Sequence, residues 1–292
     1  MKITIVSPLF NAHATILQCI GGLKNQSFTD FEVIFVDSSP NSYTKEIIMQ
    51  NSNYKLISSV KKLSSQSARN LGAKHAQGEI LVFLDPDCIP DKDWLLNLYE
   101  SFKKGYTVVG GSINCFPGNY WAGVAHIEKF WMWLPNGKSR ILKMFPSANF
   151  SIKKKLFDDL GGFYEKYEAA DIEFCYRIAD QKIEMLFNSR AVVSHIHNIK
   201  FIDLIKLRYD RGKQYADMKI NRMRWSKYKS LIYIISSPFV PWYNLIHWMF
   251  VCINRKYASM YFLSFPTLLL CEYTWYFGQN IYYAKHVIGK SL

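Results

Sequence analysis

The chain lacks the patterns by which several common classes of protein are detected. It has no Cys-x-x-Cys pair and no dense cysteine framework, which argues against a structural zinc site or a disulfide scaffold and favours a reducing compartment. Its six cysteines are scattered: Cys19, Cys88, Cys115, Cys175, Cys252 and Cys271. The N-terminus lacks the apolar core and cleavage site of a signal peptide, so we expect the N-terminal part to be cytosolic.

Two phosphate-binding motifs are also missing. The first apolar run continues as SPLFN and not as Gly-x-Gly-x-x-Gly, and no Gly-x-x-x-x-Gly-Lys loop occurs in the chain. These absences argue against a Rossmann dehydrogenase and a P-loop enzyme. The same segment has no Gly-rich, Arg- and Lys-bearing loop, which a sugar-nucleotide pyrophosphorylase would need.

The composition is that of a folded protein with a basic surface. With 292 residues the chain can form one large or two small domains, and a hydrophobic fraction of 49% supports a substantial core. The formal net charge of +13 suits nucleic acid, anionic lipid or phosphorylated substrates. No nucleic-acid motif accompanies this charge, so we expect no nucleic-acid partner.

Strand and helix patterns alternate along the first 85 residues. KITIVS, FEVIFVD, a short run at 55–57 and ILVFL have the composition of strands. Helical patterns lie between them, over residues 14–24, 43–50 and 69–76. This alternation with short links predicts an α/β fold with a mostly parallel sheet covered by helices.

An Asp-x-Asp pair follows the last of these strands. In ILVFLDPDC, Ile80–Cys88, five apolar residues predict a buried strand with Asp85 and Asp87 at its carboxyl end, where open α/β sheets bind ligands. Two carboxylates so placed suit a hard divalent cation that also holds a diphosphate. The alternative is a turn, because Asp and Pro86 are common turn residues.

The surrounding motifs resemble those of one known family. SARNLGAKHAQG precedes the strand and PDKDWL follows the acids, and together they are similar to the "ARN.G...A.GE...FLD.D" core of glycosyltransferase family 2. The resemblance extends from residue 2 to about residue 212. It implies a GT-A-type fold, a nucleotide-sugar donor and a divalent cation, Mn²⁺ or Mg²⁺.

The resemblance assigns several residues to the nucleotide sugar. Pro8, Phe10 and Asn11 occupy the place of the family's "P.YN" turn. Asp37 falls on the carboxylate that pairs with the nucleotide base, and a capped turn is its structural alternative. Arg69 matches an arginine that lies against the nucleotide, although an exposed helix arginine is equally common. Asp85 of the Asp-x-Asp motif is also assigned to the nucleotide sugar.

A second motif block supplies the expected base. SANFSIKKKLFDDLGGFYEKYEAADIEFCYRI, residues 147–178, is similar to the family's "G.NFA.RR..F...GGFDE.....ED.DL..R." segment. Asp171 falls on the Asp of the Glu-Asp pair and would accept the proton of the acceptor hydroxyl, with inversion at the sugar. Ala170 replaces the Glu, and Glu173 matches the acid two positions on. An acid at a helix start is also ordinary helix chemistry.

The third expected metal ligand is a histidine. A strand over 191–194 delivers His195 and, two residues later, His197. In the family a histidine at this point often completes the cation site with the Asp-x-Asp, here Asp87 and Asp85. We choose His195 for its register, and imidazole favours Mn²⁺ over Mg²⁺.

Two further segments bear on the reaction. Arg208 lies roughly where processive members carry "Q..RW", but the Gln and Trp are missing, so we expect transfer of one sugar with Arg208 as a candidate for diphosphate contact. The stretch 116–144 is rich in aromatic residues, and we expect an irregular connection there. Its aromatic rings would contact the acceptor or belong to the core.

The C-terminal part has the composition of a membrane-associated segment. Basic residues crowd residues 200–229, directly before apolar runs at 231–253 and 257–277. Each run is long enough to span a bilayer, but Pro238, Pro241 and Glu272 make a crossing costly. Interfacial or re-entrant helices, a spanning hairpin and a soluble helical cap remain open.

We therefore expect a GT-A catalytic domain over 1–199, a basic amphipathic linker helix over 200–230 and a hydrophobic helical region over 231–292. The expected partners are a UDP-, GDP- or dTDP-sugar, a lipid-linked or glycan acceptor and a membrane surface with anionic lipids. The expected location is the cytoplasmic face of the cell membrane. The alternative function is a catalytically inactive scaffold of the same fold, which Ala170 and the incomplete motif at Arg208 would suit.

Overall fold

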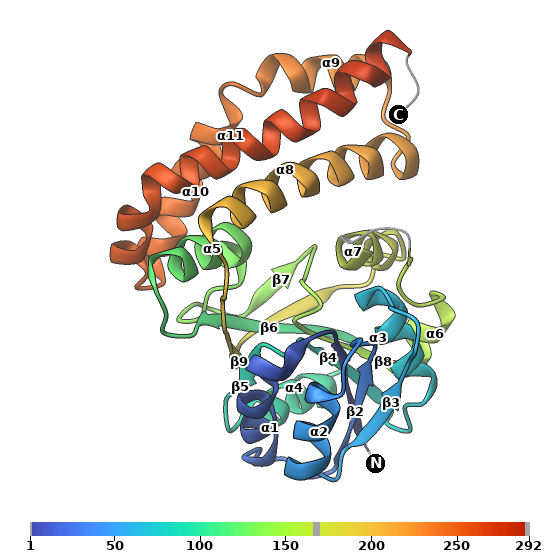
Figure 1. The fold of residues 1–292 in the computed structure, drawn as a ribbon. Helices are drawn as coiled ribbons and strands as arrows, with labels where there is room; N and C mark the ends of the chain where they lie inside the picture. Colours follow the sequence, from blue (N-terminus) through green and yellow to red (C-terminus); the bar gives the residue numbers. More distant parts are fainter. Residues whose placement is uncertain (1, 166–169, 290–292) are drawn as a thin grey trace. The chain divides into compact units, whose positions relative to one another are not determined.

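A computed structural model describes residues 2–165 and 170–289 of the chain (Figure 1). The chain divides into two compact units. Unit 1 comprises Met1–Phe116 and Trp133–Ile196, and unit 2 comprises Pro117–Met132 and His197–Leu292. The boundary after Ile196 lies close to the expected one at 199, whereas residues 117–132 group with the C-terminal helices.

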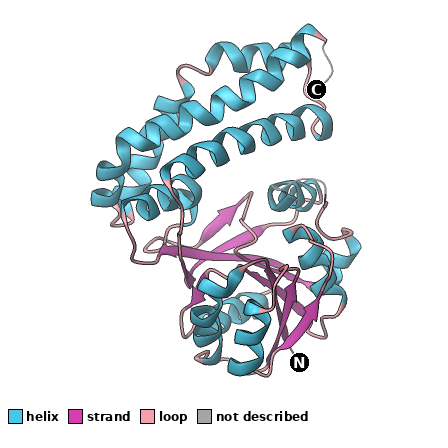
Figure 2. Cartoon of the chain, viewed as in Figure 1, coloured by secondary structure: helices cyan, strands magenta, loops and turns pink. Residues whose placement is uncertain are grey.

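Unit 1 is built on a nine-stranded sheet, whose strands Figure 2 shows in magenta. Its order is β3-β2-β1-β4-β8-β6-β9-β5, and β7 pairs with β9. The strands are β1 (Ile3–Leu9), β2 (Phe31–Asp37), β3 (Lys55–Ser58), β4 (Ile80–Leu84), β5 (Cys88–Pro90), β6 (Val108–Cys115), β7 (Arg140–Leu142), β8 (Asn149–Lys153) and β9 (Met185–His195). The first four are parallel to one another, and β6 is parallel to β9, while β8 is antiparallel to both β4 and β6.

The central strands β1 and β4 are apolar along most of their length because both of their faces are buried. All residues of β1 and β4 are buried, as expected for strands covered on both faces. The helices of unit 1 are α1 (Ile16–Lys24), α2 (Tyr43–Asn51), α3 (Ser65–Lys74), α4 (Trp94–Lys103), α6 (Lys154–Asp159) and α7 (Ala170–Asp180). The prediction of an α/β fold with a mostly parallel sheet and covering helices is confirmed.

Helix α3 begins earlier than the sequence pattern predicted. Ser64 caps its N-terminus by accepting a hydrogen bond from the Ser67 backbone N–H at 3.0 Å, so Arg69 lies in the second turn and not at the start. A Cβ on Gly72 would lie 2.4 Å from a Val6 methyl, so only glycine allows α3 to pack this closely on β1. This packing fixes the position of Arg69 above the sheet.

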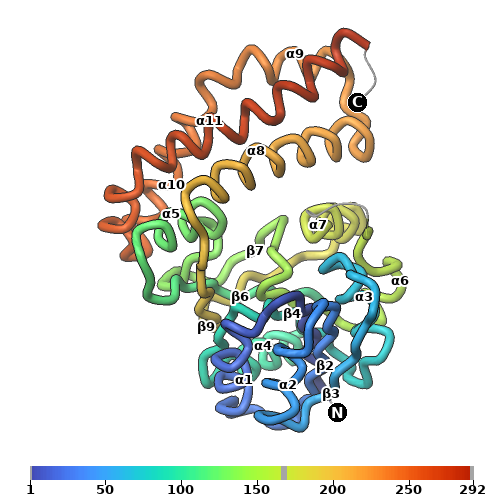
Figure 3. Tube along the Cα trace, viewed as in Figure 1, coloured from blue at the N-terminus to red at the C-terminus, as the bar shows by residue number. Residues whose placement is uncertain are grey.

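Unit 2 consists of helices. They are α5 (Tyr120–Phe130), α8 (Phe201–Asp217), α9 (Lys227–Ser236), α10 (Val240–Asn254) and α11 (Ala258–Ile288), and a π-helix over Met218–Arg222 follows α8. The trace in Figure 3 shows α8 and α11 side by side. A Cβ on Gly212 would lie 2.3 Å from the Trp275 carbonyl, and one on Gly278 equally close to the Tyr209 carbonyl, so two glycines allow the backbones to approach.

The structure corrects the expectation of an irregular connection over 116–144. This stretch holds α5, a 3₁₀ turn over Trp131–Trp133 and β7. Asn119 caps α5 by accepting from the Ala122 backbone N–H at 3.1 Å, which starts a helix that the density of aromatic residues had obscured. Phe130 is fully buried and Trp131 stacks on Trp248 with ring centres 5.6 Å apart, so these two rings belong to the core.

The basic segment after residue 200 is likewise not one helix. α8 ends at Asp217, and the π-helix and a turn separate it from α9. Among residues 2–165 and 170–289, no helix combines the length and the apolar character that crossing a membrane requires.

Candidate functional site

Four strands of unit 1 bring polar side chains to one edge of the sheet (Figure 1). β2 ends at Asp37, and Asp85 directly follows the parallel strand β4. β8 is antiparallel to β4, so its start, near Ser147, lies at this same edge. β6 is antiparallel to β8 and parallel to β9, so β9 also ends there, at His195. The carboxyl ends of parallel strands are where open α/β sheets bind ligands.

Asp37 lies in a buried turn at this edge. It is 5% exposed, and its Oδ1 accepts from the Ser39 N–H at 3.0 Å and the Ser39 hydroxyl at 2.6 Å. The Ser39 hydroxyl also accepts from the Asn11 N–H at 2.8 Å, so the turns after β1 and β2 are joined. Asp37 therefore caps a turn with one carboxylate oxygen, and among the described residues its Oδ2 has no hydrogen-bond donor.

The other residues of the first turn differ in exposure. Pro8 is buried within β1 and pairs with Val36, whereas Asn11 is exposed and has a left-handed backbone with φ of 53°. Phe10 is 43% exposed, and the Lys62 ammonium lies 4.4 Å from its ring centre. The ring and the backbone of Asn11 therefore face solvent beside Asp37.

Arg69 and Asp85 form an ion pair between α3 and the end of β4. The Arg69 side chain is 5% exposed and that of Asp85 is 20% exposed. The Arg69 Nε–H is buried and has no acceptor among the described residues. The pair thus places one carboxylate and one guanidinium at the sheet edge, and the Arg69 Nε–H can still donate a hydrogen bond to a ligand.

Asp87 lies beside His195. The Asp87 Oδ1 is 3.5 Å from the His195 Nε2, and the Asp87 carbonyl accepts from the Ile196 N–H at 2.8 Å, which ties the Asp-x-Asp turn to the end of β9. Cys88 starts β5 and pairs with His195 across the two antiparallel strands. Donor atoms of Asp87, Cys88 and His195 all lie within 4.8 Å of one another.

This donor set fits a divalent cation. A carboxylate oxygen and an imidazole nitrogen are ligands that Mn²⁺ accepts, and the exposed side of Asp87 leaves room for further oxygen ligands. Asp85 is not in the cluster, because its carboxylate contacts Arg69. Of the two acids predicted to bind metal, Asp87 is therefore the one that the structure places with His195.

Asp171 lies in the first turn of α7 and is half-buried. Its Oδ2 accepts from the Ser147 N–H at 3.1 Å, and its Oδ1 accepts from the Ile172 N–H at 2.9 Å. These contacts hold the carboxylate against the start of β8, at the same sheet edge as Asp85.

Glu173 supports α7 from the side. Its Oε2 accepts from the Arg177 Nε at 3.0 Å, and the Arg177 Nη2 donates to the Gly162 carbonyl at 2.7 Å. Gly161 and Gly162 have φ values of 77° and 69°, a left-handed conformation that explains the Gly-Gly pair. The acid two positions beyond Asp171 is thus a structural anchor for the helix that carries it.

Sequence reasoning missed the role of Asn70. Its side-chain Nδ2 donates to the Phe163 carbonyl at 2.8 Å, and its Oδ1 accepts from the Phe163 N–H at 2.9 Å. Glu165 accepts from Asn70 at 3.0 Å and from the Ser67 hydroxyl at 2.6 Å. The SARN and GGF motifs are therefore bonded to each other, a link that their joint presence in the family pattern could have suggested.

Arg208 lies in unit 2, in a buried ion cluster. Its guanidinium contacts the Glu128 carboxylate and donates to the Glu272 Oε1 at 2.9 Å, and it stacks on Trp275 at 4.3 Å from the ring centre. Asn244 donates to the second Glu272 oxygen at 2.7 Å. These contacts favour a structural role within unit 2, and the expected diphosphate contact stays a prediction.

His197, the second candidate histidine, also lies in unit 2. Its Nε2 is 3.1 Å from the Nδ1 of the fully buried His126. Burial and the nearby Lys129 lower the pKa of His197 to about 3. The structure thus separates the two histidines, with His195 beside Asp87 and His197 beside His126.

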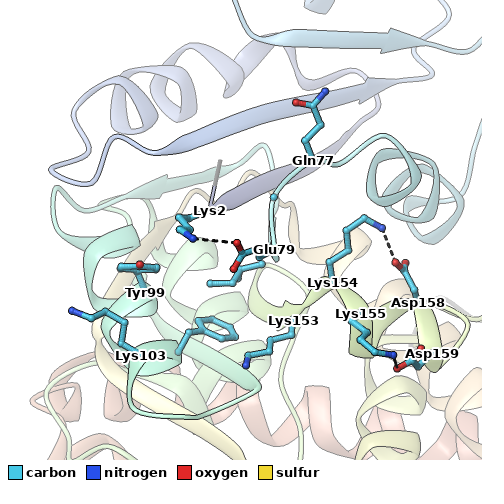
Figure 4. Close-up of a pocket in the computed structure, with 13 residues that line it drawn as sticks. Lys2, Gln77, Glu79, Tyr99, Lys103, Lys153, Lys154, Lys155, Asp158 and Asp159 are labelled. Carbon is cyan, nitrogen blue, oxygen red and sulfur yellow. Dashed lines mark hydrogen bonds and ion pairs between the residues drawn. The ribbon is translucent and has the colours of Figure 1, made fainter.

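A pocket of about 750 Å³ lies at the opposite, amino-terminal edge of the unit 1 sheet (Figure 4). Several of its lysines are neutralised by neighbouring acids: Lys2 by Glu79 at 3.1 Å, Lys154 by Asp158 at 2.6 Å and Lys155 by Asp159 at 2.8 Å. None of the predicted site residues lines it. This pocket is therefore not the place where the acids meet.

Comparison with known proteins identifies the family. Residues 4–163, more than half of the chain, match the family described as Glycosyl transferase family 2. The chain is a family 2 glycosyltransferase. The matched range contains Asp37, Arg69 and the Asp-x-Asp motif and ends at the Gly-Gly-Phe turn, so the predicted family is confirmed. Asp171, His195 and Arg208 lie after the matched range, and their roles stay predictions.

Three known proteins indicate the breadth of the similarity. The glycosyltransferase is 24% identical to Glycosyltransferase AglE of Haloferax volcanii over 219 residues, which cover 72% of each chain. It is 31% identical over 120 residues to the Escherichia coli protein named UDP-Glc:alpha-D-GlcNAc-diphosphoundecaprenol beta-1,3-glucosyltransferase WfgD, covering 40% of this chain and 45% of WfgD.

The third is a solved structure, the mannosyltransferase PcManGT from Pyrobaculum calidifontis in complex with GDP-Man and Mn²⁺. It superposes with a TM-score of 0.56 at 19% identity, over 77% of this chain and 65% of PcManGT. At that identity the likeness concerns the fold, which is of the GT-A type, as predicted. This glycosyltransferase thus spans less than two thirds of WfgD and of PcManGT.

Proposed function

We propose that this enzyme transfers a single sugar, with inversion, from a nucleoside-diphosphate sugar to a hydroxyl of a lipid-linked or glycan acceptor. The proposal depends on one observation: groups suited to each part of that reaction lie at the same edge of the sheet. These groups are Asp37, the Arg69–Asp85 pair, Asp87 with His195, and Asp171. A nucleotide base, a diphosphate and an attacking alcohol would each find a partner there.

Asp171 is the proposed general base. The acceptor O–H gives its proton to the Asp171 carboxylate while the oxygen forms a bond to the anomeric carbon, and the bond from that carbon to the diphosphate breaks with its electron pair. Attack opposite the leaving group inverts the configuration. The N–H groups of Ser147 and Ile172 hold the carboxylate in place for this step.

Asp87 and His195 are the proposed protein ligands of a divalent cation, with Asp85 at the diphosphate beside them. When bound, the cation neutralises the charge that develops on the leaving diphosphate. Arg69 holds Asp85 in place, and its unused Nε–H suits a phosphate or ribose oxygen.

Asp37 and the turn after β1 form the proposed base and ribose site. The free Oδ2 of Asp37 suits the imide N–H of uracil, and an acceptor left without that partner would cost about 1–3 kcal/mol. Phe10 offers an exposed ring beside it, and Pro8 and Asn11 shape the turn. Thymine and guanine also carry a ring N–H next to a carbonyl, so this contact is compatible with a UDP-, dTDP- or GDP-sugar.

The relatives support the donor and acceptor classes. The name of WfgD gives UDP-Glc as donor and a diphosphoundecaprenol-linked sugar as acceptor, and PcManGT was solved with GDP-Man and Mn²⁺. The missing "Q..RW" motif supports one transfer per acceptor rather than processive synthesis.

Unit 2 is the proposed membrane-associated part. On α10, exposed apolar residues recur at helical spacing: Phe239 before the helix, then Trp242, Tyr243, Ile246, Phe250 and Ile253. The opposite stripe of α10, which includes Leu245 and Cys252, is buried. Because the inner stripe already fills the unit 2 core, the outer one has no role in folding this unit.

The exposed stripe of α10 continues onto α11. The Trp242 indole donates to the Tyr273 hydroxyl at 2.9 Å, and Phe262, Leu263, Leu270 and Phe277 are exposed on α11. Residues 218–292 contain nine lysines and arginines and a single carboxylate side chain, the buried Glu272. An apolar, aromatic face in a cationic segment suits the surface of a membrane with anionic lipids, where a lipid-linked acceptor resides.

The experiment is a transfer assay with Mn²⁺, a panel of UDP-, GDP- and dTDP-sugars and lipid-linked acceptors, run on wild type, Asp171→Asn and Asp180→Asn. Asp180 is the exposed acid at the other end of α7 and serves as the matched control. We expect one donor class to react, a loss of at least about a hundredfold for Asp171→Asn, and no change for Asp180→Asn. Donor binding without turnover in the wild type would favour the scaffold, and equal rates for all three proteins would remove Asp171 as the base.

A further inference from the structure

The strand pairing at the cation site places a thiol beside the predicted ligands. Cys88 begins β5, and its partner in the antiparallel register is His195, the last residue of β9. Directly opposite residues in an antiparallel pair project their side chains to the same face, with Cβ atoms about 5 Å apart. The Cys88 side chain therefore points the same way as the imidazole, and both residues are nearly fully buried.

Asp87 completes the cluster from the preceding position. The Cys88 sulfur lies 3.9 Å from the Asp87 Oδ1, which itself lies 3.5 Å from the His195 Nε2. One possible ligand atom from each of the three residues lies within 4.8 Å of the other two. The separations of 3.9 and 3.5 Å are each shorter than the sum of two metal–ligand bonds of about 2.0–2.3 Å, so one cation could bind both atoms of either pair.

Asp85 does not compete for this position. Its carboxylate is held by Arg69, which leaves the three-residue cluster with one oxygen, one nitrogen and one sulfur donor. An Asp-x-Asp site with two carboxylates would select hard cations. Replacing one oxygen by sulfur changes that preference, because thiolate ligands favour Zn²⁺ and other soft cations.

We propose that Cys88 is a third ligand in this site, so that the enzyme binds a thiophilic cation such as Zn²⁺ at the place where Mn²⁺ supports transfer. The inference rests on the cation site of the proposed function, but binding by Cys88 does not require turnover. Zn²⁺ would hold Asp87, Cys88 and His195 together and keep Mn²⁺ from its working position. Zn²⁺ is then an inhibitor that competes with Mn²⁺.

The binding step releases a proton. Cys88 binds the cation as a thiolate, so the S–H bond breaks, the sulfur electron pair forms the bond to the cation and the proton goes to solvent. Nothing is oxidised or reduced in this step.

The test uses the full chain and Co²⁺ as a coloured probe for Zn²⁺. A cobalt–thiolate bond gives an intense ultraviolet charge-transfer absorption that oxygen and nitrogen ligands do not give. We expect this absorption on titration of the wild type, its loss in Cys88→Ala and Cys88→Ser, and its displacement by Zn²⁺. Competition with Zn²⁺ should show an affinity loss of more than the roughly 10–100-fold that outer-shell partners cost.

Cys115→Ala is the matched control. Cys115 pairs with His195 from the other neighbouring strand, so it is a thiol that could produce the same signal if the assignment were wrong. Absorption that survives in Cys88→Ala and disappears in Cys115→Ala would overturn the proposal. So would bound Co²⁺ without the thiolate absorption in the wild type, a result that needs no variant to fold.

The outcome separates this inference from the proposed function. Transfer with Mn²⁺ but no cobalt–thiolate absorption would leave the glycosyltransferase reaction standing and remove Cys88 as a ligand. Thiolate absorption without transfer to any acceptor would leave the cation site standing and remove the proposed reaction. Retention of Mn²⁺ binding by Cys88→Ser shows that this variant keeps the rest of the site.

Discussion

Arg69 and Asp85 lie 16 residues apart in the sequence and form an ion pair that joins α3 to the carboxyl end of β4. Both side chains are largely buried, and Gly72 brings α3 close enough to the sheet for the guanidinium to reach. Asp85 is thereby fixed away from the Asp87–Cys88–His195 cluster. The two acids of the Asp-x-Asp motif thus have different partners.

The first prediction concerns this ion pair. Arg69→Ala leaves the Asp85 charge without its partner in a mostly buried place, so we expect unfolding free energy to fall by about 3 kcal/mol, measured by urea denaturation. Lys155→Ala breaks an ion pair between exposed side chains and should leave the unfolding free energy nearly unchanged. Equal losses of unfolding free energy in the two variants would show that the buried ion pair contributes no more to stability than the exposed one.

Local patterns were sufficient for the first half of unit 1. The strands and helices from β1 to β4 were predicted because their apolar periodicity is strong and their connections are short. The carboxylates at strand ends followed from the same patterns. In contrast, the partner of Asp85 could not be deduced, because it depends on how closely α3 packs on β1.

Long-range partners limited the prediction elsewhere. Arg208 was assigned to the diphosphate from its place in the sequence, but its contacts Glu128 and Glu272 lie 80 and 64 residues away. Cys88 was treated only as one of six scattered cysteines, because its neighbour His195 is reached through the pairing of β5 with β9. The contacts of Arg208 depend on how the helices of unit 2 pack, and that of Cys88 depends on the order of the strands in unit 1. No local pattern encodes either.

The second prediction concerns the hydrogen bonds of Asn70, which link the SARN motif to the GGF motif. Asn70→Asp removes the donor to the Phe163 carbonyl and places a negative charge beside Glu165, so unfolding free energy should fall by about 1–3 kcal/mol. Transfer should fall too, because these bonds hold Phe163 and Glu165, which precede the segment that carries Asp171. Asn53→Asp makes the same chemical change at an exposed position and should alter neither quantity. An unchanged melting temperature for Asn70→Asp would contradict the linking role.

The third prediction concerns membrane binding by unit 2. Phe239 and Phe250 are 74% and 57% exposed on the apolar stripe, so replacing both by Ser should weaken sedimentation with vesicles that contain anionic lipid. Lys229→Glu should weaken it by a factor of about five or more at low salt and less at high salt. Val60→Ser changes a fully exposed apolar residue of unit 1 and is the control. If the double Ser variant binds vesicles as well as the wild type does, this apolar face is not the membrane-binding surface.

The last prediction concerns a lysine enclosed by aromatic rings. The Lys219 ammonium lies 4.5, 4.4 and 4.6 Å from the ring centres of Tyr215, Trp225 and Tyr233, and burial lowers its pKa to about 8 from 10.5. The unfolded chain therefore binds this proton more tightly than the folded one. Stability should rise as pH increases from about 8 to about 10.5, because the proton that opposes folding is lost in that window.

Lys219→Met tests this explanation, because it keeps the length of the side chain and removes the charge. We expect the variant to be at least as stable as the wild type at pH 7 and to lack the rise in stability between pH 8 and 10.5, both measured by chemical denaturation at each pH. Lys206→Met, on the exposed side of α8, should keep the wild-type profile. If Lys219→Met instead loses about 2 kcal/mol at pH 7, the attraction between the ammonium and the three rings outweighs the cost of burying the charge.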